Sequence, residues 1–338
     1  MKATLLLPDK SRWEGQAFGA PGVAIGHIAC HTGEYMDFCA DPACANQLVF
    51  PAAPLVGMLG LNIEHGESGK PWLSGLILRD VCDVACHWRS AEGLNDFLRR
   101  HFITAIAGLD TRALLRHIQK KGPFRAAICA NPDFQGWDAL LAKLNGSTMG
   151  ALYPAAARRP TVYRPDIPAV GSVGLIDLGS PAALIKSLLR QGLAVTRLPP
   201  LGDWTPEEFP RWAVSHGARE DGHDNGLAAK IKQIIASGRP LLAVGNGFSL
   251  ICQALGLPMT ATRFGFHGDD IAVDGGSRTL MTAQNHRLTL RLPKDAEIEA
   301  THSNVVDRSC VGFALPGRPV SAFQFQTPHI FPKGWNNQ

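Results

Sequence analysis

The sequence lacks a long apolar run, a paired cysteine motif and a strong excess of charge of either sign. No segment approaches the roughly 20 apolar residues that a membrane helix needs, and the first apolar run ends at Pro8 and Asp9, too short for a signal peptide. The net charge is only +4, and Lys and Arg are scattered, so no basic surface for nucleic acid is indicated. We therefore expect a cytoplasmic globular protein without membrane or nucleic-acid partners.

The eight cysteines contain no CxxC pair and lie mostly among apolar residues. In a reducing compartment such residues are usually small buried hydrophobes. A zinc site made of Cys30, His31, Cys39 and Cys44 is an alternative, but its spacing fits no standard pattern. Asp269 and Asp270 beside His267 do not suggest a metal either, because adjacent strand residues point to opposite faces. The sequence predicts no metal and no cofactor.

Residues 1–146 are predicted to form a β-rich domain with a few helices. The short apolar runs "ATLLLPD", "GVAIGHIAC", "NQLVFPA" and "LSGLILRDV" are separated by Gly, Pro and Asp, as strands are. Helices are expected within 90–101 and 110–122. In the second of these, Asp110 is the expected N-cap, Leu114, Leu115 and Ile118 the apolar stripe, and Gly122 the stop.

Residues 147–172 contain four prolines and no period, which indicates an interdomain linker. From Val173 to Gln338 strands and helices alternate with short connections, and this predicts an open parallel sheet with an added β layer near the C-terminus. Helices are expected to start at Ser180-Pro181 and at the capping box Thr205-Pro206-Glu207-Glu208. The fold class is therefore α/β.

The stretch "LLAVGNGFSLICQALG", from Leu241 to Gly256, reads as a buried strand, a sharp turn and an apolar helix. We call this strand–helix turn the elbow. Many α/β enzymes mount a nucleophile at such a turn, and sites in open sheets form at the carboxyl ends of the strands. Here the tip is Gly245-Asn246-Gly247, without Ser, Cys or Asp.

The chain resembles a known family on several motifs. "GEYMDFCADPACANQLVF", "GLILRDVCDVACHWRSAEGLNDFLRRH" and "IAGLDTRALLRHIQKKGPFRAAI" are similar to the N-terminal domain of the carbamoyl-phosphate synthetase small chain. "VGLIDLGSPAALIKSLLRQGLAV", "FGFHGDDIAV", "MTAQNH" and "PVSAFQFQ" resemble, in order, its class I glutamine amidotransferase domain. The resemblance covers nearly the whole chain, except for a C-terminal helix that the family usually carries.

The resemblance implies glutamine hydrolysis by a Cys at the elbow, with a His as base and a Glu that orients the His. The released ammonia would pass to a large synthetase subunit. This sequence departs from the family at each of those positions, which hold Gly245, Gln326 and Pro328. A glycine cannot attack, and a carboxamide has no useful pKa for proton transfer.

The glutamine pocket that the resemblance implies is also altered. The oxyanion turn reads His216 to Asp221, with Arg219 in place of a Gly. A substrate-contacting Ser becomes Ala43, a Gln becomes Ser249, and the Gly-Phe after the "QNH" turn becomes Arg287-Leu288. The degenerate pocket is therefore predicted at Ala43, Gly217, Arg219, Gly247, Ser249, Gln284, Asn285 and Arg287.

Other residues could replace the lost nucleophile or base. Cys252 lies about two turns into the elbow helix among apolar residues, which favours a core position. Cys44 follows the Ala43 position, but the sequence identifies no paired base. His329 lies near the lost His position and could serve if its loop shifted.

Hypotheses of different classes follow. The first is a pseudoenzyme, a partner of a carbamoyl-phosphate synthetase large chain in a heteromer that serves pyrimidine or arginine biosynthesis. The second is an amidase or glutamine amidotransferase with a relocated nucleophile, Cys44 or His329. The third is a small-anion sensor that uses Arg219 or Arg287.

Overall fold

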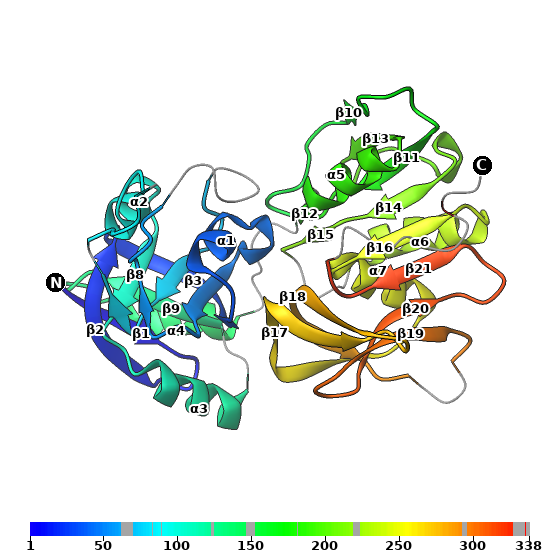
Figure 1. The fold of residues 1–338 in the computed structure, drawn as a ribbon. Coiled ribbons are helices and arrows are strands. Elements are labelled where there is room, and N and C mark those ends of the chain that lie inside the picture. The colour runs from blue at the N-terminus through cyan, green and yellow to red at the C-terminus, as the bar shows by residue number, and fades with distance from the viewer. Residues whose placement is uncertain are drawn as a thin grey trace. The chain divides into compact units, whose positions relative to one another are not determined.

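The computed structural model describes residues 1–61, 70–82, 84–88, 90–122, 125–146, 153–180, 182–218, 224–292, 296–326 and 335. The chain divides into two compact units, Met1–Ala151 and Leu152–Gln338 (Figure 1). Each unit has its own hydrophobic clusters, so each is described by itself.

Unit 1 is built on a closed barrel of short strands. In barrel order these are β1 (Lys2–Leu6), β2 (Arg12–Gly19), β8 (Thr104–Ala107), β6 (Gly75–Ile77), β4 (Gln47–Pro51), β3 (Gly22–His31) and β9 (Arg125–Ala130). Leu5, Leu48, Ile77, Ile106 and Ile128 pack together inside it. The predicted strands correspond to β1, β3, β4 and β6, whereas β2 was not predicted because polar residues interrupt its sequence.

The helices of unit 1 are α1 (Tyr35–Ala40), α2 (Leu94–Arg100), α3 (Thr111–Lys121) and α4 (Trp137–Asn145), with a 3₁₀ turn at Pro42–Cys44. Both predicted helices are present. The Asp110 carboxylate accepts a hydrogen bond from the Ala113 N–H at 2.9 Å, and Gly122 ends α3 at φ +104°. A small parallel pair, β5 (Leu55–Val56) and β7 (Asp80–Val81), completes the unit.

Unit 2 contains one continuous mixed sheet. Its order is β10 (Thr161–Tyr163), β13 (Leu193–Leu198), β11 (Gly171–Ile176), β14 (Trp212–Val214), β16 (Leu241–Val244), β21 (Val320–Phe323), β20 (Cys310–Ala314), β18 (Thr279–Leu290), β17 (Met259–Asp274) and β19 (Glu299–Asn304). The strands from β13 to β21 are parallel, and those beyond β21 are antiparallel. The strands expected as an added layer therefore extend the same sheet, and β10 lies in the segment expected as a linker.

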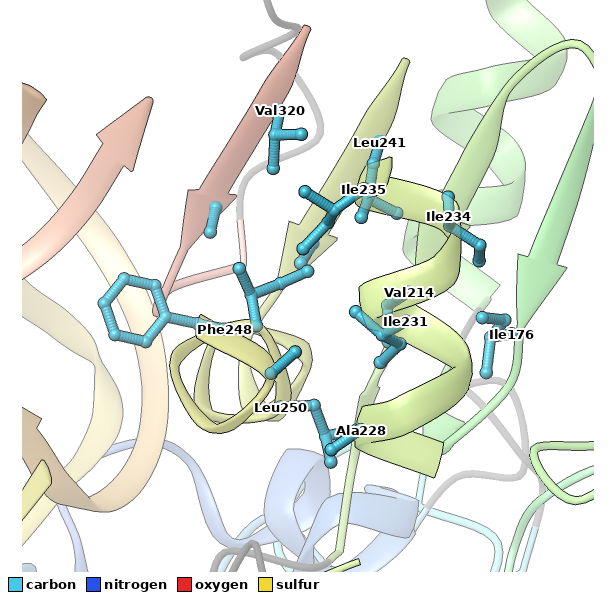
Figure 2. Packing of buried hydrophobic residues seen from close by; sticks show 14 of the residues in the cluster. Ile176, Val214, Ala228, Ile231, Ile234, Ile235, Leu241, Phe248, Leu250 and Val320 are labelled. Carbon is cyan, nitrogen blue, oxygen red and sulfur yellow. The ribbon is translucent and has the colours of Figure 1, made fainter. Parts of the chain in front are cut away.

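Helices cover both faces of the parallel strands. Helix α5 (Ala182–Arg190) packs on Val173, Leu175 and Val195. Helices α6 (Asn225–Ala236) and α7 (Asn246–Leu255) pack together on the opposite face. There Ile231, Ile235, Phe248 and Leu250 meet strand residues that include Ile176, Val214, Leu241 and Val320 (Figure 2). This two-sided cover explains the near-continuous apolar strands.

Two predicted helix starts are corrected by the structure. The capping box of Thr205 and Glu208 is present, but only a 3₁₀ turn follows (Pro206–Glu208). Phe209 is extended at φ −129°, as expected for a residue before a proline. Ser180 lies in the short strand β12 (Gly179–Ser180), which pairs with β15 (His216–Gly217), and α5 begins at Ala182.

Candidate functional site

The elbow has the backbone geometry of a turn that presents a nucleophile. Strand β16 is fully buried, Gly245 adopts φ +55° and ψ −124°, and α7 begins at the next residue. This conformation is one that residues with a side chain rarely adopt, and enzymes with a strand–turn–helix nucleophile place such a strained residue at this point. Here a glycine holds the position without strain.

The imidazole of His216 takes the space that a side chain at the tip of the elbow would enter. A Cβ built on Gly245 would lie 2.0 Å from Nδ1 and 2.5 Å from Cγ of His216. Both residues follow neighbouring parallel strands, β14 and β16, so they meet at one edge of the sheet. The tip of the elbow therefore carries no side chain, and His216 fills the space that one would enter.

His216 also takes up a hydrogen-bond donor of the elbow. The backbone N–H of Asn246 donates to Nδ1 of His216 at 3.1 Å, and the Asn246 side-chain amide donates to the Gly217 carbonyl. Nδ1 is thus the unprotonated nitrogen, and Nε2 carries the hydrogen of the neutral ring. In acyl-transfer enzymes with this turn, the N–H after the nucleophile stabilises the oxyanion. In this chain it binds an imidazole.

The surroundings keep His216 uncharged. The residue is 1% exposed, and burial lowers the pKa of its imidazole to about 4. Within the described part of the chain, Nε2 of His216, Oδ1 of Asn246 and Oγ of Ser249 are buried without a hydrogen-bond partner. The first turn of α7 therefore keeps polar groups but no group that is ionised at neutral pH.

Backbone contacts hold the turn that carries His216. The Leu178 N–H donates to Oγ of Ser215 at 2.8 Å, and the Ser215 hydroxyl donates to the His216 carbonyl at 2.9 Å. A Cβ on Gly217 would lie 2.0 Å from the Leu178 carbonyl oxygen, so only glycine fits there. The fit is less strict at Gly247, where a Cβ would lie 3.0 Å from the Val214 side chain, which would have to shift by a few tenths of an ångström.

Asp177, which the sequence analysis missed, anchors the same edge of the sheet. It is fully buried and accepts hydrogen bonds from Nε of Arg197 and the Ala157 N–H at 2.6 Å, and from the Gly179 N–H at 2.8 Å. Nη2 of Arg197 lies 2.5 Å from the same carboxylate. The sequence feature that could have identified Asp177 is an acidic residue directly after the apolar run of strand β11.

The predicted base position, Gln326, is held by β18. Its backbone N–H donates to the Ala283 carbonyl at 2.9 Å, and the residue is half-buried. Gln324 donates from its side chain to the Leu288 carbonyl at 2.5 Å. Pro328 and His329 lie outside the described residues, as does Arg219.

The "QNH" residues lie within strand β18, and the prediction of a turn is wrong. Gln284 donates to Oγ1 of Thr282 at 2.8 Å, and its Oε1 lies 2.8 Å from Nε2 of His286. Asn285 accepts from Nδ1 of His267 at 2.6 Å. Burial, with a smaller effect of His267, lowers the pKa of His286 to about 3. These residues bind one another locally, and Arg287 beside them is half-buried.

In unit 1, Ala43 and Cys44 lie in the buried 3₁₀ turn that Asp41 caps through the Ala43 N–H at 2.8 Å. The structure brings a histidine to Cys44, which the sequence did not reveal: Nε2 of His31 lies 3.8 Å from Sγ. The Cys44 thiol is nevertheless fully buried.

The structure gives little support to Cys252 as a nucleophile or to a metal site. Cys252 is fully buried in the core, and burial raises the pKa of its thiol well above the usual value. In the described part of the chain, no group of three or more His, Cys, Asp or Glu could hold a metal ion. Among the described helices, none has the length and apolarity to cross a membrane.

Comparison with known proteins bears on both units. Residues 5–128 match the family model for the carbamoyl-phosphate synthase small chain, CPSase domain, and residues 176–326 match glutamine amidotransferase class-I. The carbamoyl phosphate synthase small chain of Mycolicibacterium paratuberculosis is 30% identical over 86% of this chain and 81% of that protein. The protein of the same name from Streptomyces avermitilis is 28% identical, over 96% of this chain and 90% of that protein.

Among solved structures, the chain is similar to a glutamine amidotransferase from Thermotoga maritima. That similarity has a TM-score of 0.37 and 16% identity, and covers 46% of this chain and 75% of the other. The matches to both domain models, in the same order, and the relatives that align along most of the chain agree with one another. The chain belongs to the carbamoyl phosphate synthase small chain family.

Proposed function

We propose that this protein is a small-chain homologue that does not hydrolyse glutamine. The observation that carries the proposal is the elbow, where Gly245 offers no nucleophile and His216 fills the space beside it. The neutral imidazole also accepts the Asn246 N–H, which would otherwise support an oxyanion. Nucleophilic catalysis needs an activated group at the reacting carbon, and the elbow has none.

The direct test is ammonia release from glutamine by the purified chain, beside an active small chain of the family as positive control. We expect no rate above that of buffer. Replacing Gly245 by Cys alone should not restore turnover, because the new Cβ would meet His216 at 2.0 Å. Glutamine-dependent ammonia release by the unmodified chain would contradict the proposal.

The role that fits a family member without glutaminase activity is that of a structural or regulatory partner. In this proposal the chain binds a synthetase large chain, which makes carbamoyl phosphate for pyrimidine or arginine synthesis from free ammonia. Support comes from the match of residues 5–128 to the small-chain domain and from relatives named as small chains.

Association is tested by co-expression with a large chain from the same cell, followed by affinity purification and size-exclusion chromatography. We expect a complex of defined stoichiometry, and a change in the ammonia-dependent rate of the large chain when it binds. Separate elution of the two chains at low and at moderate salt would contradict the partner role and leave the glutaminase result unaffected.

A second candidate function is an amidase that uses Cys44, and the 3.8 Å contact with His31 favours it. Against it stands the complete burial of Cys44. Any amide hydrolysis should then be lost in Cys44→Ala and kept in Cys252→Ala, whose thiol is equally buried but lies in the apolar core of unit 2.

A further inference from the structure

The cysteines differ sharply in their access to solvent. Cys86 is exposed, Cys82 and Cys30 are half-buried, and the others are buried: Cys39, Cys44, Cys129, Cys252 and Cys310. Burial raises the pKa of Cys30 and Cys310 to about 11, and that of Cys39 further. Because the thiolate is the reactive form, these buried thiols are poor nucleophiles. Cys82 and Cys86 combine better access with nearness to each other.

Both thiols point at the same backbone oxygen. Sγ of Cys82 lies 3.1 Å from the Val84 carbonyl oxygen, and Sγ of Cys86 lies 3.4 Å from it. The two sulfurs are therefore no further apart than the sum of these distances, about 6.5 Å. A disulfide needs roughly 2.05 Å between the sulfurs, so its formation requires the two side chains to rotate about their Cα–Cβ bonds.

Hydrogen bonds to residues 56–58 hold the main chain of both cysteines. The Cys82 N–H donates to the Val56 carbonyl and the Cys86 N–H to the Met58 carbonyl, each at 2.8 Å. Between these anchors Gly57 packs so closely that a Cβ on it would lie 2.4 Å from the Cys82 carbonyl oxygen. The two cysteines are thus held next to each other by one segment, whereas Val84 between them is 70% exposed.

We propose that Cys82 and Cys86 form a thiol–disulfide exchange site for low-molecular-weight disulfides such as oxidised glutathione. The Cys86 thiolate, which is more exposed, attacks one sulfur of the small disulfide and releases one thiol, leaving a mixed disulfide. The Cys82 thiolate then attacks the Cys86 sulfur and releases the second thiol. The protein loses two protons and two electrons, and the small disulfide is reduced to two thiols.

Oxidation would change the surface around the pair. The Val84 carbonyl would lose both thiol donors, and a covalent bond would close the loop next to the exposed side chains of Leu55, Met58, Val84 and Trp88. Exposed disulfides have potentials at which cellular thiols can reduce them, so the change is reversible. The site would report the thiol–disulfide balance of its surroundings, independently of glutamine chemistry.

The experiment equilibrates the full native chain with mixtures of reduced and oxidised glutathione, followed by acid quench, alkylation and peptide mass mapping. We expect one disulfide that joins Cys82 to Cys86, reversed by excess reduced glutathione, while the peptides of Cys129 and Cys252 stay reduced. A disulfide that involves another cysteine, or no oxidation of the native chain, would overturn the proposal.

Two serine variants separate the roles of the thiols. In the Cys82→Ser variant the reaction should stop at a mixed disulfide on Cys86, because the Cys82 thiol that would attack this disulfide is gone. Cys86→Ser should react about tenfold more slowly, since attack then depends on the less accessible thiol. Phenylarsine oxide, a probe that bridges two neighbouring thiols, should bind the unmodified chain and neither variant. Stable mixed disulfide on the unmodified chain, or equal arsenical binding by the variants, would show that the thiols do not act as a pair.

Discussion

The His216 ring occupies the space into which a side chain at Gly245 would project, where β14 and β16 end. The Cβ that Gly245 lacks would lie 2.0 Å from the His216 ring, so each residue is tolerated because of the other. A cysteine at the tip and a histidine in the neighbouring turn cannot coexist in this geometry. Any side chain at position 245 would therefore require the His216 ring to move.

Replacing Gly245 by Ala should destabilise unit 2 by about 3–4 kcal/mol, from the positive φ and the overlap with His216. Gly256 is a matched control: it ends the same helix at φ +72°, and a Cβ on it would meet nothing within 4 Å. Gly256→Ala should cost only about 1 kcal/mol. Urea denaturation of both variants measures the difference.

A double-mutant cycle isolates the overlap. In a His216→Ala background, the cost of Gly245→Ala should fall, because the overlap with Nδ1 and Cγ of the ring is removed, while the contact with Cβ of residue 216 at 2.7 Å and the backbone strain remain. If Gly245→Ala costs the same in both backgrounds, the imidazole does not occupy the space assigned to it.

Buried neutral histidines make the free energy of unfolding depend on pH. Burial lowers the pKa of His216 from 6.5 to about 4 and that of His286 to about 3. Below about pH 6.5 the unfolded chain binds protons that the folded chain refuses, so stability falls as the pH falls. Each histidine should remove about 2 kcal/mol between pH 7 and pH 5.

Denaturation series at several pH values test this expectation, with His216→Asn as the matched variant. The variant should lose about half of the pH dependence that these two histidines cause in that range, because one of the two imidazoles with a strongly lowered pKa is gone. An unchanged slope in His216→Asn would mean that His216 titrates normally in the folded protein.

At the scale of the elements, Asp177 joins three segments of unit 2. Its carboxylate accepts from Arg197 on β13, from Ala157 before β10 and from Gly179 in β12, which pairs with the strand of His216. Because Asp177 is fully buried and Arg197 is mostly buried, neither charge has much access to water. The pair therefore fixes how the strand ends around the elbow are arranged.

Asp177→Asn should destabilise the protein by about 3 kcal/mol, because it leaves the Arg197 charge unpaired and turns an acceptor into a donor opposite backbone N–H groups. The control is Asp80→Asn, whose partner Arg79 lies 3.4 Å away in an exposed pair. That change should have an effect close to zero. Equal effects in the two variants would contradict the anchoring role of Asp177.

Local sequence signals predicted some elements well and others poorly. Asp110 and Gly122 delimit α3 because an N-cap acceptor and a left-handed stop act within a few residues. The Thr205 capping box formed as predicted, yet Pro210 two residues after it limits the helix to one 3₁₀ turn. The family resemblance placed the "QNH" segment at a turn, but it lies within strand β18, where its side chains bind one another and nearby residues.

At the scale of the whole molecule, the order of strands and helices and the family motifs predicted the α/β class and the family. The glycine at the tip of the elbow, in place of Cys, Ser or Asp, was also visible in the sequence, since it depends on one residue type at one turn. The role of His216 was not, because it arises from the approach of two strand ends that are neighbours only in the folded sheet. The contact of Cys44 with His31 likewise joins residues that lie apart in the sequence and was not predicted.

The measurement that tests the central claim most directly is the release of ammonia and glutamate from glutamine, by the chain alone and with a synthetase large chain present. The account predicts no glutamine turnover in either case and no covalent glutamyl adduct in the intact mass, while the large chain still uses free ammonium. Glutamine-dependent turnover, or an adduct on any cysteine of the chain, would contradict it.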